Sequence, residues 1–94
     1  MANFIICYDE RATPKPDYTP LYNMLNGWSA KHLQNSVWLL SMNSNAAAIR
    51  DALRAVMHPN DTVGVIQLPA DENAGWATSY DRTDGVRWLQ AHYP

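Results

Sequence analysis

The 94-residue sequence predicts an α+β fold, and three observations support this. Two apolar runs, "FIICY" and "TVGVIQL", have the composition of buried strands. Between them, two segments carry apolar residues at helical spacing. A third segment, "VWLL", is rich in the residue types that favour strands. Strands and helices therefore alternate within one short chain.

The first expected strand is Phe4–Tyr8, which is apolar at every position. Because its residues do not alternate, we expect both of its faces to be buried at the centre of a sheet. Cys7 lies inside this run and is expected to be a buried, inert apolar group. Residues 10–17 contain two prolines and predict a loop.

The first helix is expected after that loop, with Asp17 or Thr19 as its cap and Pro20 in its first turn. Gly27 is placed to end it. Its apolar stripe comprises Tyr18, Leu21, Tyr22 and Leu25.

The middle of the chain predicts two strands, Lys31–Gln34 and Ser36–Ser41, separated by a bend or bulge at Asn35. Ser44 or Asn45 then caps a second helix. The buried stripe of this helix comprises Ile49, Ala52, Leu53 and Val56. Its outward positions are Arg50, Asp51 and Arg54.

After a turn at "HPND", Thr62–Leu68 predicts the last core strand. In the tail, Trp76–Tyr80 is expected to be a short edge strand and Arg82–His92 a short helix. The helix would be anchored by Val86, Trp88 and Leu89.

The resulting order is β-α-β-β-α-β plus a tail, the split βαβ or ferredoxin-like sandwich. We expect one domain over residues 1–94, with its core in about 3–68 and a dimer-arm segment in about 69–94. Two helices cover only one face of such a sheet, so the other apolar face is expected to be bare. A second copy of the chain would cover it, which predicts a homodimer.

The composition is that of a globular protein, with 47% hydrophobic and 17% charged residues. A net charge of −2 and a pI of about 5.8 argue against a surface that wraps nucleic acid. One cysteine excludes a disulfide framework within the chain. With neither a signal-peptide pattern nor a membrane-length apolar run, the expected location is cytoplasmic, with no membrane partner.

Several motifs are similar to the small CRISPR-associated endonuclease family, the minor subunit of the spacer-integration complex. They are Tyr8-Asp9 at the end of the first strand, Leu33-Gln34-Asn35-Ser36-Val37-Trp38, and the strand "DTVGVIQL". Relatives described as SinR-like resemble the chain more closely. The shared positions are Asp17-Tyr18, Leu21-Tyr22, Leu25, Ser36-Val37-Trp38-Leu39, Ile49-Arg50-Asp51-Ala52-Leu53, Gly75-Trp76 and Trp88-Leu89.

This resemblance implies a homodimer whose two sheets face each other, with the C-terminal segment reaching toward the partner. It also implies that Asp9 lies near the two-fold axis, where two such carboxylates would hold Mg²⁺ or Mn²⁺. Ser36 is the second site position that carries over. The other interpretation is that Asp9 marks the strand end and caps the next loop. Glu10 is not expected to assist, since adjacent strand residues point to opposite sides unless the strand has ended.

The three histidines have no metal-ligand spacing, although His32 is expected near Ser36 on adjoining strands. The four tryptophans are expected to serve core or interface packing rather than base stacking. The arginines lie among aspartates, which predicts a mixed, solvated surface.

The sequence favours a dimeric, non-catalytic interaction module of the CRISPR-associated small-subunit type, in a defence or mobile-element context. The alternative is an Mg²⁺- or Mn²⁺-dependent endonuclease that hydrolyses DNA or RNA through paired Asp9 at the dimer axis. A third candidate is a toxin-like ribonuclease. Besides a second copy, the expected partners are nucleic acid or a larger protein complex.

Overall fold

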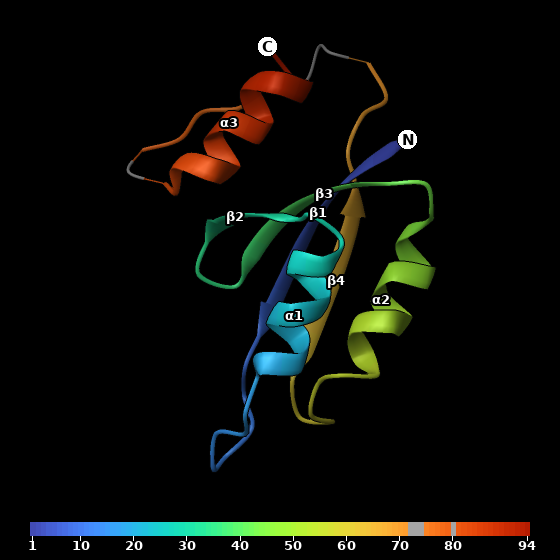
Figure 1. The fold of residues 1–94 in the computed structure, drawn as a ribbon, viewed down its shortest axis with the longest axis vertical. Helices are drawn as coiled ribbons and strands as arrows, with labels where there is room; N and C mark the ends of the chain where they lie inside the picture. Colours follow the sequence, from blue (N-terminus) through green and yellow to red (C-terminus); the bar gives the residue numbers. More distant parts are fainter. Residues whose placement is uncertain (72–74, 80) are drawn as a thin grey trace.

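A computed structural model describes residues 1–71, 75–79 and 81–94 of the chain. These residues form one four-stranded antiparallel sheet and three helices (Figure 1). The elements are β1 (Ala2–Asp9), α1 (Thr19–Gly27), β2 (Lys31–Gln34), β3 (Val37–Met42), α2 (Ala46–Arg54), β4 (Thr62–Gln67) and α3 (Thr83–His92). The predicted α+β class is confirmed.

The strands are ordered β2-β3-β1-β4, and every neighbouring pair is antiparallel. Strand β1 lies between β3 and β4, so the predicted central position of the first apolar run is confirmed. Ile5 faces Leu39 of β3 on one side and Ile66 of β4 on the other. This register assigns every side chain of β1 to one of two faces, because side chains alternate along a strand.

The turn between β2 and β3 contains the irregularity expected at Asn35. The register of the two strands shifts between His32 and Gln34, and Ser36 adopts a φ of 65°. A positive φ is uncommon for serine and fits a tight turn. The carbonyl oxygen of Ser36 accepts a hydrogen bond of 3.0 Å from the Tyr8 N–H, which ties the turn to β1.

The first face of the sheet holds the main core. Phe4, Ile6 and Tyr8 of β1 are buried on this face, where α1 and α2 pack against it. The predicted helical stripes supply the other side of this core, with Leu21, Leu25, Ile49 and Leu53 fully buried. The Asn45 side chain caps α2 by accepting a 2.9 Å hydrogen bond from the Ala48 N–H, as predicted.

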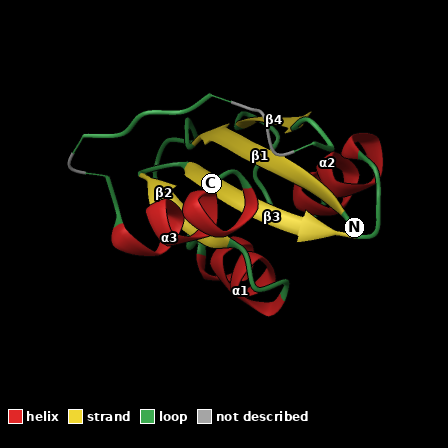
Figure 2. Cartoon of the chain, turned by 90° about the horizontal axis from the view of Figure 1, so that it is seen from above, coloured by secondary structure: helices red, strands yellow, loops and turns green. Residues whose placement is uncertain are grey.

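The second face is covered in part by the chain itself. Helix α3 lies at the β2 side of the sheet, far from α2 (Figures 1 and 2). Its buried residues Trp88 and Leu89 pack with Leu33 and Leu39 of β2 and β3 in a second apolar cluster. The expectation that this face would be bare is therefore wrong for its β2–β3 half, because the tail folds back over it.

Part of the β1–β4 half of the second face remains open, although Ile5 and Leu68 pack against the second cluster. We call the exposed residues Cys7, Gly64 and Ile66 the open patch. Ile66 is 61% exposed, Cys7 is exposed, and a Cβ built on Gly64 would meet no atom within 4 Å. The expectation that Cys7 is buried is wrong, because its side chain lies on the half of the sheet that α3 does not reach.

The C-terminal segment is fixed to the sheet by polar contacts as well as by apolar packing. The Tyr93 hydroxyl donates a 2.6 Å hydrogen bond to the Pro69 carbonyl and accepts one of 3.2 Å from the Asn3 amide. The Trp76 indole N–H donates to the Tyr93 carbonyl at 2.6 Å. The predicted C-terminal helix is confirmed as α3. Residues 76–79 form no strand, and Tyr80 of that prediction lies outside the described residues.

The tryptophans all pack against one of the two clusters, as expected. Trp38 and Trp88 are buried within them. Trp28 is partly buried against the first cluster and Trp76 against the second. In the described part of the chain, no helix is long and apolar enough to cross a membrane.

Gly85 provides a test of how closely α3 approaches β2. A Cβ at this position would lie 2.6 Å from the Leu33 Cα and 2.8 Å from the His32 carbonyl oxygen. We expect Gly85→Ala to lower the free energy of unfolding by about 2 kcal/mol, since backbone must move to admit the methyl group. Urea unfolding measures this change.

Gly27→Ala is the matched control, because a Cβ there would meet nothing within 4 Å. It should be neutral or stabilising by up to about 1 kcal/mol, as is usual for glycine replaced within a helix. Equal effects of the two substitutions would contradict the close packing of α3 on β2.

Candidate functional site

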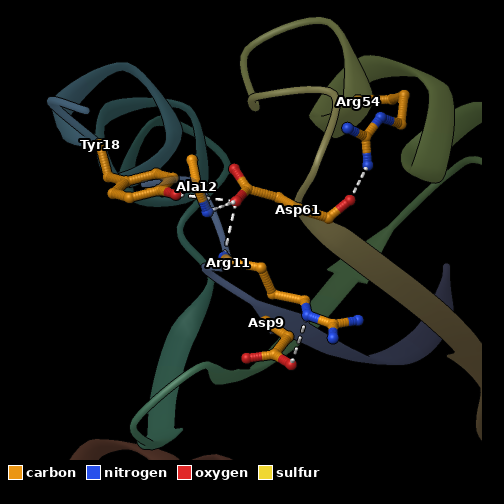
Figure 3. A network of polar contacts seen from close by, with 6 residues as sticks. All are labelled: Asp9, Arg11, Ala12, Tyr18, Arg54 and Asp61. Atoms are coloured by element: carbon orange, nitrogen blue, oxygen red, sulfur yellow. Dashed lines mark hydrogen bonds and ion pairs between the residues drawn. The ribbon is translucent and has the colours of Figure 1, made fainter. Parts of the chain in front are cut away.

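Asp9, the predicted metal-holding residue, lies at the end of β1 with its side chain about 70% exposed. Its carboxylate is 3.8 Å from the Arg11 guanidinium, also a largely exposed group (Figure 3). An exposed ion pair of this kind contributes little to stability. Because Asp9 alternates with Tyr8, its side chain lies on the second face of the sheet, the face that carries the open patch.

Ser36, the second predicted site residue, lies in a different place. It lines a hollow with Tyr8 and Glu10, on the other side of β1 from Asp9. The structure therefore does not bring the two predicted site residues together within one chain. The carboxylate that shares the hollow with Ser36 is Glu10. Because β1 ends at Asp9, the Glu10 side chain does not have to follow the alternation of side chains along the strand.

We call this hollow the strand-end cleft. It has a volume of about 310 Å³ and is formed where the end of β1 meets α1 and the β2–β3 turn. Its lining residues are Tyr8, Glu10, Lys15, Tyr22, His32, Asn35 and Ser36. The cleft thus gathers two phenols, an imidazole, an amide, a hydroxyl and one charge of each sign.

Two hydrogen bonds fix the phenols of the cleft. The Trp38 indole N–H donates to the Tyr8 hydroxyl at 2.9 Å, and the Tyr22 hydroxyl donates to Glu10 Oε2 at 2.7 Å. Burial raises the pKa of Tyr8, the bond from Trp38 offsets part of this, and the Glu10 charge adds to it. Burial, the hydrogen bond to Glu10 and the charge of Glu10 all raise the pKa of Tyr22. Both phenols are therefore protonated at neutral pH.

His32 forms another wall of the cleft. Its ring stacks on the Trp38 indole with 4.2 Å between centroids and 8° between planes. Burial lowers the pKa of His32, and the charge of Arg82 lowers it further, so the imidazole is neutral at pH 7. Its Nε2 is buried and has no hydrogen-bond partner among the residues that the structure describes.

Asp61 holds the segment that follows β1. This buried carboxylate accepts hydrogen bonds from the N–H groups of Arg11 at 2.8 Å and Ala12 at 3.1 Å, and from the Tyr18 hydroxyl at 2.8 Å (Figure 3). Its second oxygen accepts from the His58 N–H at 3.0 Å. By fixing the residues directly after Glu10, the Asp61 network positions one wall of the strand-end cleft.

The pKa values of Tyr18 and Asp61 within this network are shifted in opposite directions. Burial, the bond to Asp61 and the charges of Asp61 and Glu10 raise the pKa of Tyr18 to about 12. Burial would raise the pKa of Asp61, but the donated hydrogen bonds together outweigh it, so the pKa of Asp61 is lowered. The Asp61 side chain is therefore a carboxylate at neutral pH.

Arg54 closes the turn before β4 and does not face outward as expected. Its guanidinium donates to the carbonyl oxygen of Asp61 at 2.6 Å (Figure 3). It also donates to the carbonyl oxygen of His58. Arg50, in contrast, forms an exposed ion pair with Asp51 at 3.0 Å. The prediction of a mixed, solvated surface is correct for Arg50 and Asp51 and wrong for Arg54.

A metal site within one chain finds no support in residues 1–71, 75–79 and 81–94. No group of three or more His, Cys, Asp or Glu side chains among them is arranged to hold a metal ion. An Asp9 metal site would therefore need the carboxylate of a second chain together with water or phosphate oxygens, which are ordinary Mg²⁺ ligands.

Comparison with known proteins gives no family for this chain. No protein-family model matches it, and no solved structure matches it. The resemblance to the CRISPR-associated family therefore remains an expectation drawn from the motifs in the sequence.

Sequence reasoning missed Glu10, Tyr22 and Asp61 as polar contributors to this region. The sequence shows Tyr22 only as a member of an apolar stripe and Asp61 only as a turn residue. One signal for Asp61 is its place directly before an apolar strand, where a carboxylate lies close to the interior. Nothing local indicates that three of its four donors lie 43 to 50 positions away in the sequence.

Asp61→Ala should leave the buried donors of Arg11, Ala12 and Tyr18 unpaired and lower the free energy of unfolding by about 3 kcal/mol. The pKa of Asp61 is lowered in the folded state, so its contribution is complete above the unfolded pKa of about 4. The contribution is lost as the pH falls through the folded pKa. Urea unfolding from pH 7 to pH 2 measures both effects.

The matched control is Asp51→Ala, which removes an exposed carboxylate. It should change stability by less than about 0.5 kcal/mol and leave the acid dependence of the wild type in place. If Asp61→Ala retains the full acid dependence, the Asp61 network does not stabilise the fold in the way described.

Proposed function

We propose that this protein is a dimeric, non-catalytic interaction module of the CRISPR-associated small-subunit type, acting in a defence or mobile-element context. In the proposed arrangement the chain is ferredoxin-like and a second copy stacks on the open patch. The element order β-α-β-β-α-β before α3, with strand order β2-β3-β1-β4, supports the ferredoxin-like part of the proposal.

The observation that carries the proposal is the open patch itself. Ile66 is 61% exposed on the half of a sheet face whose other half is a packed apolar cluster. The patch contains no charged group, and an uncharged surface beside a packed apolar cluster suits the centre of an interface. Its continuity with the α3 cluster would let one partner extend the existing apolar layer.

A second copy fits this surface because the patch is complementary to itself. A two-fold interface brings the same surface of both chains together, so it needs a protrusion beside a depression. Ile66 protrudes, while Gly64 and Cys7 are small, and the space above Gly64 is open. In the proposed dimer, Ile66 of each chain would pack over Gly64 of the other.

The non-catalytic character is supported by charge. The chain has a net charge of −2, and Arg11, the cation closest to Asp9, is already paired with it. Nucleic acids are bound mainly through their phosphates. A phosphodiester substrate would therefore bind weakly near Asp9, where there is little positive potential.

The metal-dependent endonuclease is retained as the second candidate, on one specific observation. Asp9 is exposed and lies on the same face as the open patch. A dimer stacked through that patch would place both copies of Asp9 on the surfaces that face each other. Two carboxylates with a bound Mg²⁺ or Mn²⁺ would be able to activate water.

The dimer is tested by Ile66→Glu. We expect the wild-type protein to be a dimer at micromolar concentration and the variant to be a monomer, measured by size-exclusion chromatography with light scattering. A buried, unpaired carboxylate in the interface should weaken association by more than about 100-fold.

Ala47→Glu is the control, since Ala47 is exposed in the first turn of α2 and a carboxylate there suits the helix dipole. This variant should remain a dimer. Circular dichroism should show both variants folded. A monomeric wild-type protein at about 100 μM would contradict the proposal.

The choice between module and nuclease is tested with labelled single- and double-stranded DNA and RNA in Mg²⁺ or Mn²⁺. We expect no cleavage above a blank by the wild-type protein. Cleavage by the wild type that is lost in Asp9→Asn, but kept in Asp51→Asn, would establish the endonuclease instead. Cleavage of RNA alone, independent of metal and of Asp9, would favour the toxin-like ribonuclease.

A further inference from the structure

The strand-end cleft has the composition of a small-molecule site that neither the dimer nor the metal proposal uses. It opens on the helix side of the sheet, away from the face that carries Asp9 and the open patch. Its volume of about 310 Å³ falls at the small end of the range for ligand pockets. A ligand held there would be bound by a single chain.

The two charges of the cleft are both available to a ligand. Glu10 and Lys15 line the same cleft, yet neither forms an ion pair with any residue that the structure describes. Glu10 Oε2 already accepts the Tyr22 hydroxyl, which orients the carboxylate and leaves Oε1 for a ligand. The Lys15 ammonium lies 6.0 Å from the centroid of the Tyr18 ring, a neighbour that leaves its charge uncompensated.

The neutral groups of the cleft also have unused hydrogen-bonding capacity. His32 Nε2 is buried without a partner in the described ranges. The Tyr8 hydroxyl accepts a hydrogen bond from Trp38, and no described residue accepts its own proton. Because buried polar groups are normally paired, the proton of the Tyr8 hydroxyl points to a polar ligand or ordered water as its missing partner, whereas His32 Nε2 has no surface that a ligand in the cleft could reach.

We propose that the strand-end cleft binds a small zwitterion, a free amino acid or a dipeptide. The ligand ammonium would bind Oε1 of Glu10, the carboxylate oxygen that does not accept the Tyr22 hydroxyl. The ligand carboxylate would bind Lys15. The Tyr8 hydroxyl would then bond the polar backbone atoms between the two charges.

The charge balance selects this ligand over the other small molecules. Glu10 and Lys15 cancel, and His32 is neutral, so the lining has no net charge. A phosphate ester would face one cation and one repelling carboxylate. A simple amine would leave Lys15 unpaired, and a simple acid would leave Glu10 unpaired. Only a ligand that carries both charges matches both ends.

The test is an NMR titration of the full-length wild-type protein with four probes. Glycylglycine carries both charges, N-acetylglycylglycine lacks the cation, glycylglycinamide lacks the anion, and inorganic phosphate is a general anion. We expect glycylglycine to shift the amide signals of residues 8–10 and 35–36. Removing either ligand charge should weaken binding by at least about tenfold.

Two variants assign the binding to its residues. Glu10→Gln keeps an acceptor for Tyr22 and removes the charge, and Lys15→Met keeps the length of the side chain. Each should weaken glycylglycine binding by at least about tenfold. The matched controls Asp51→Asn and Lys31→Met change exposed charges outside the cleft and should bind as the wild type does.

The proposal is overturned by any of three results. These are no shift with glycylglycine up to about 10 mM, equal binding of the three peptides, and a preference for phosphate. Because the cleft lies within one chain, Ile66→Glu should bind glycylglycine unchanged. The ligand and the dimer are thereby tested separately.

Discussion

The width of one helix relative to four strands determines which part of the sheet is exposed to solvent. A helix with its side chains is about 10 Å wide, whereas strands are spaced about 4.8 Å apart, so one helix covers about two strands. Helices α1 and α2 together shelter the first face. On the second face α3 is the single helix, and its cluster covers β2, β3 and Ile5 of β1. Cys7, Gly64 and Ile66 of β1 and β4 are left exposed.

The residues of the second face follow this division. Under α3 the sheet presents the large residues Leu33 and Leu39, which fill the space below Trp88. On the uncovered half it presents Cys7 and Gly64, with Ile66 as the large exception. Small residues limit the apolar area exposed in a single chain, and Ile66 is the residue that would anchor the proposed second copy. The proposed docking surface therefore involves no large exposed core.

Local sequence patterns were sufficient to predict most of the helices and strands, but not which faces of the sheet the helices cover. The bounds of β2, the Asn45 cap and the stripe of α2 follow from neighbouring residues, so the sequence contains them. The exposure of Cys7 depends on where a helix about 80 positions later comes to lie. An apolar run looks the same whether or not something covers it. The Asp61 network is equally hard to predict, since Asp61 is distant in sequence from three of its four donors.

The two acidic residues at the end of β1 lie on different surfaces because the strand ends between them. Asp9 is the last residue of the strand and shares its second face, whereas Glu10 lies beyond the strand and turns into the cleft. These adjacent carboxylates therefore lie on different surfaces of the chain. The Asp61 carboxylate fixes the residues that follow, which keeps Glu10 on its side. The proposed dimer interface and the proposed ligand site would in this way lie on opposite sides of one strand, and neither would need the other.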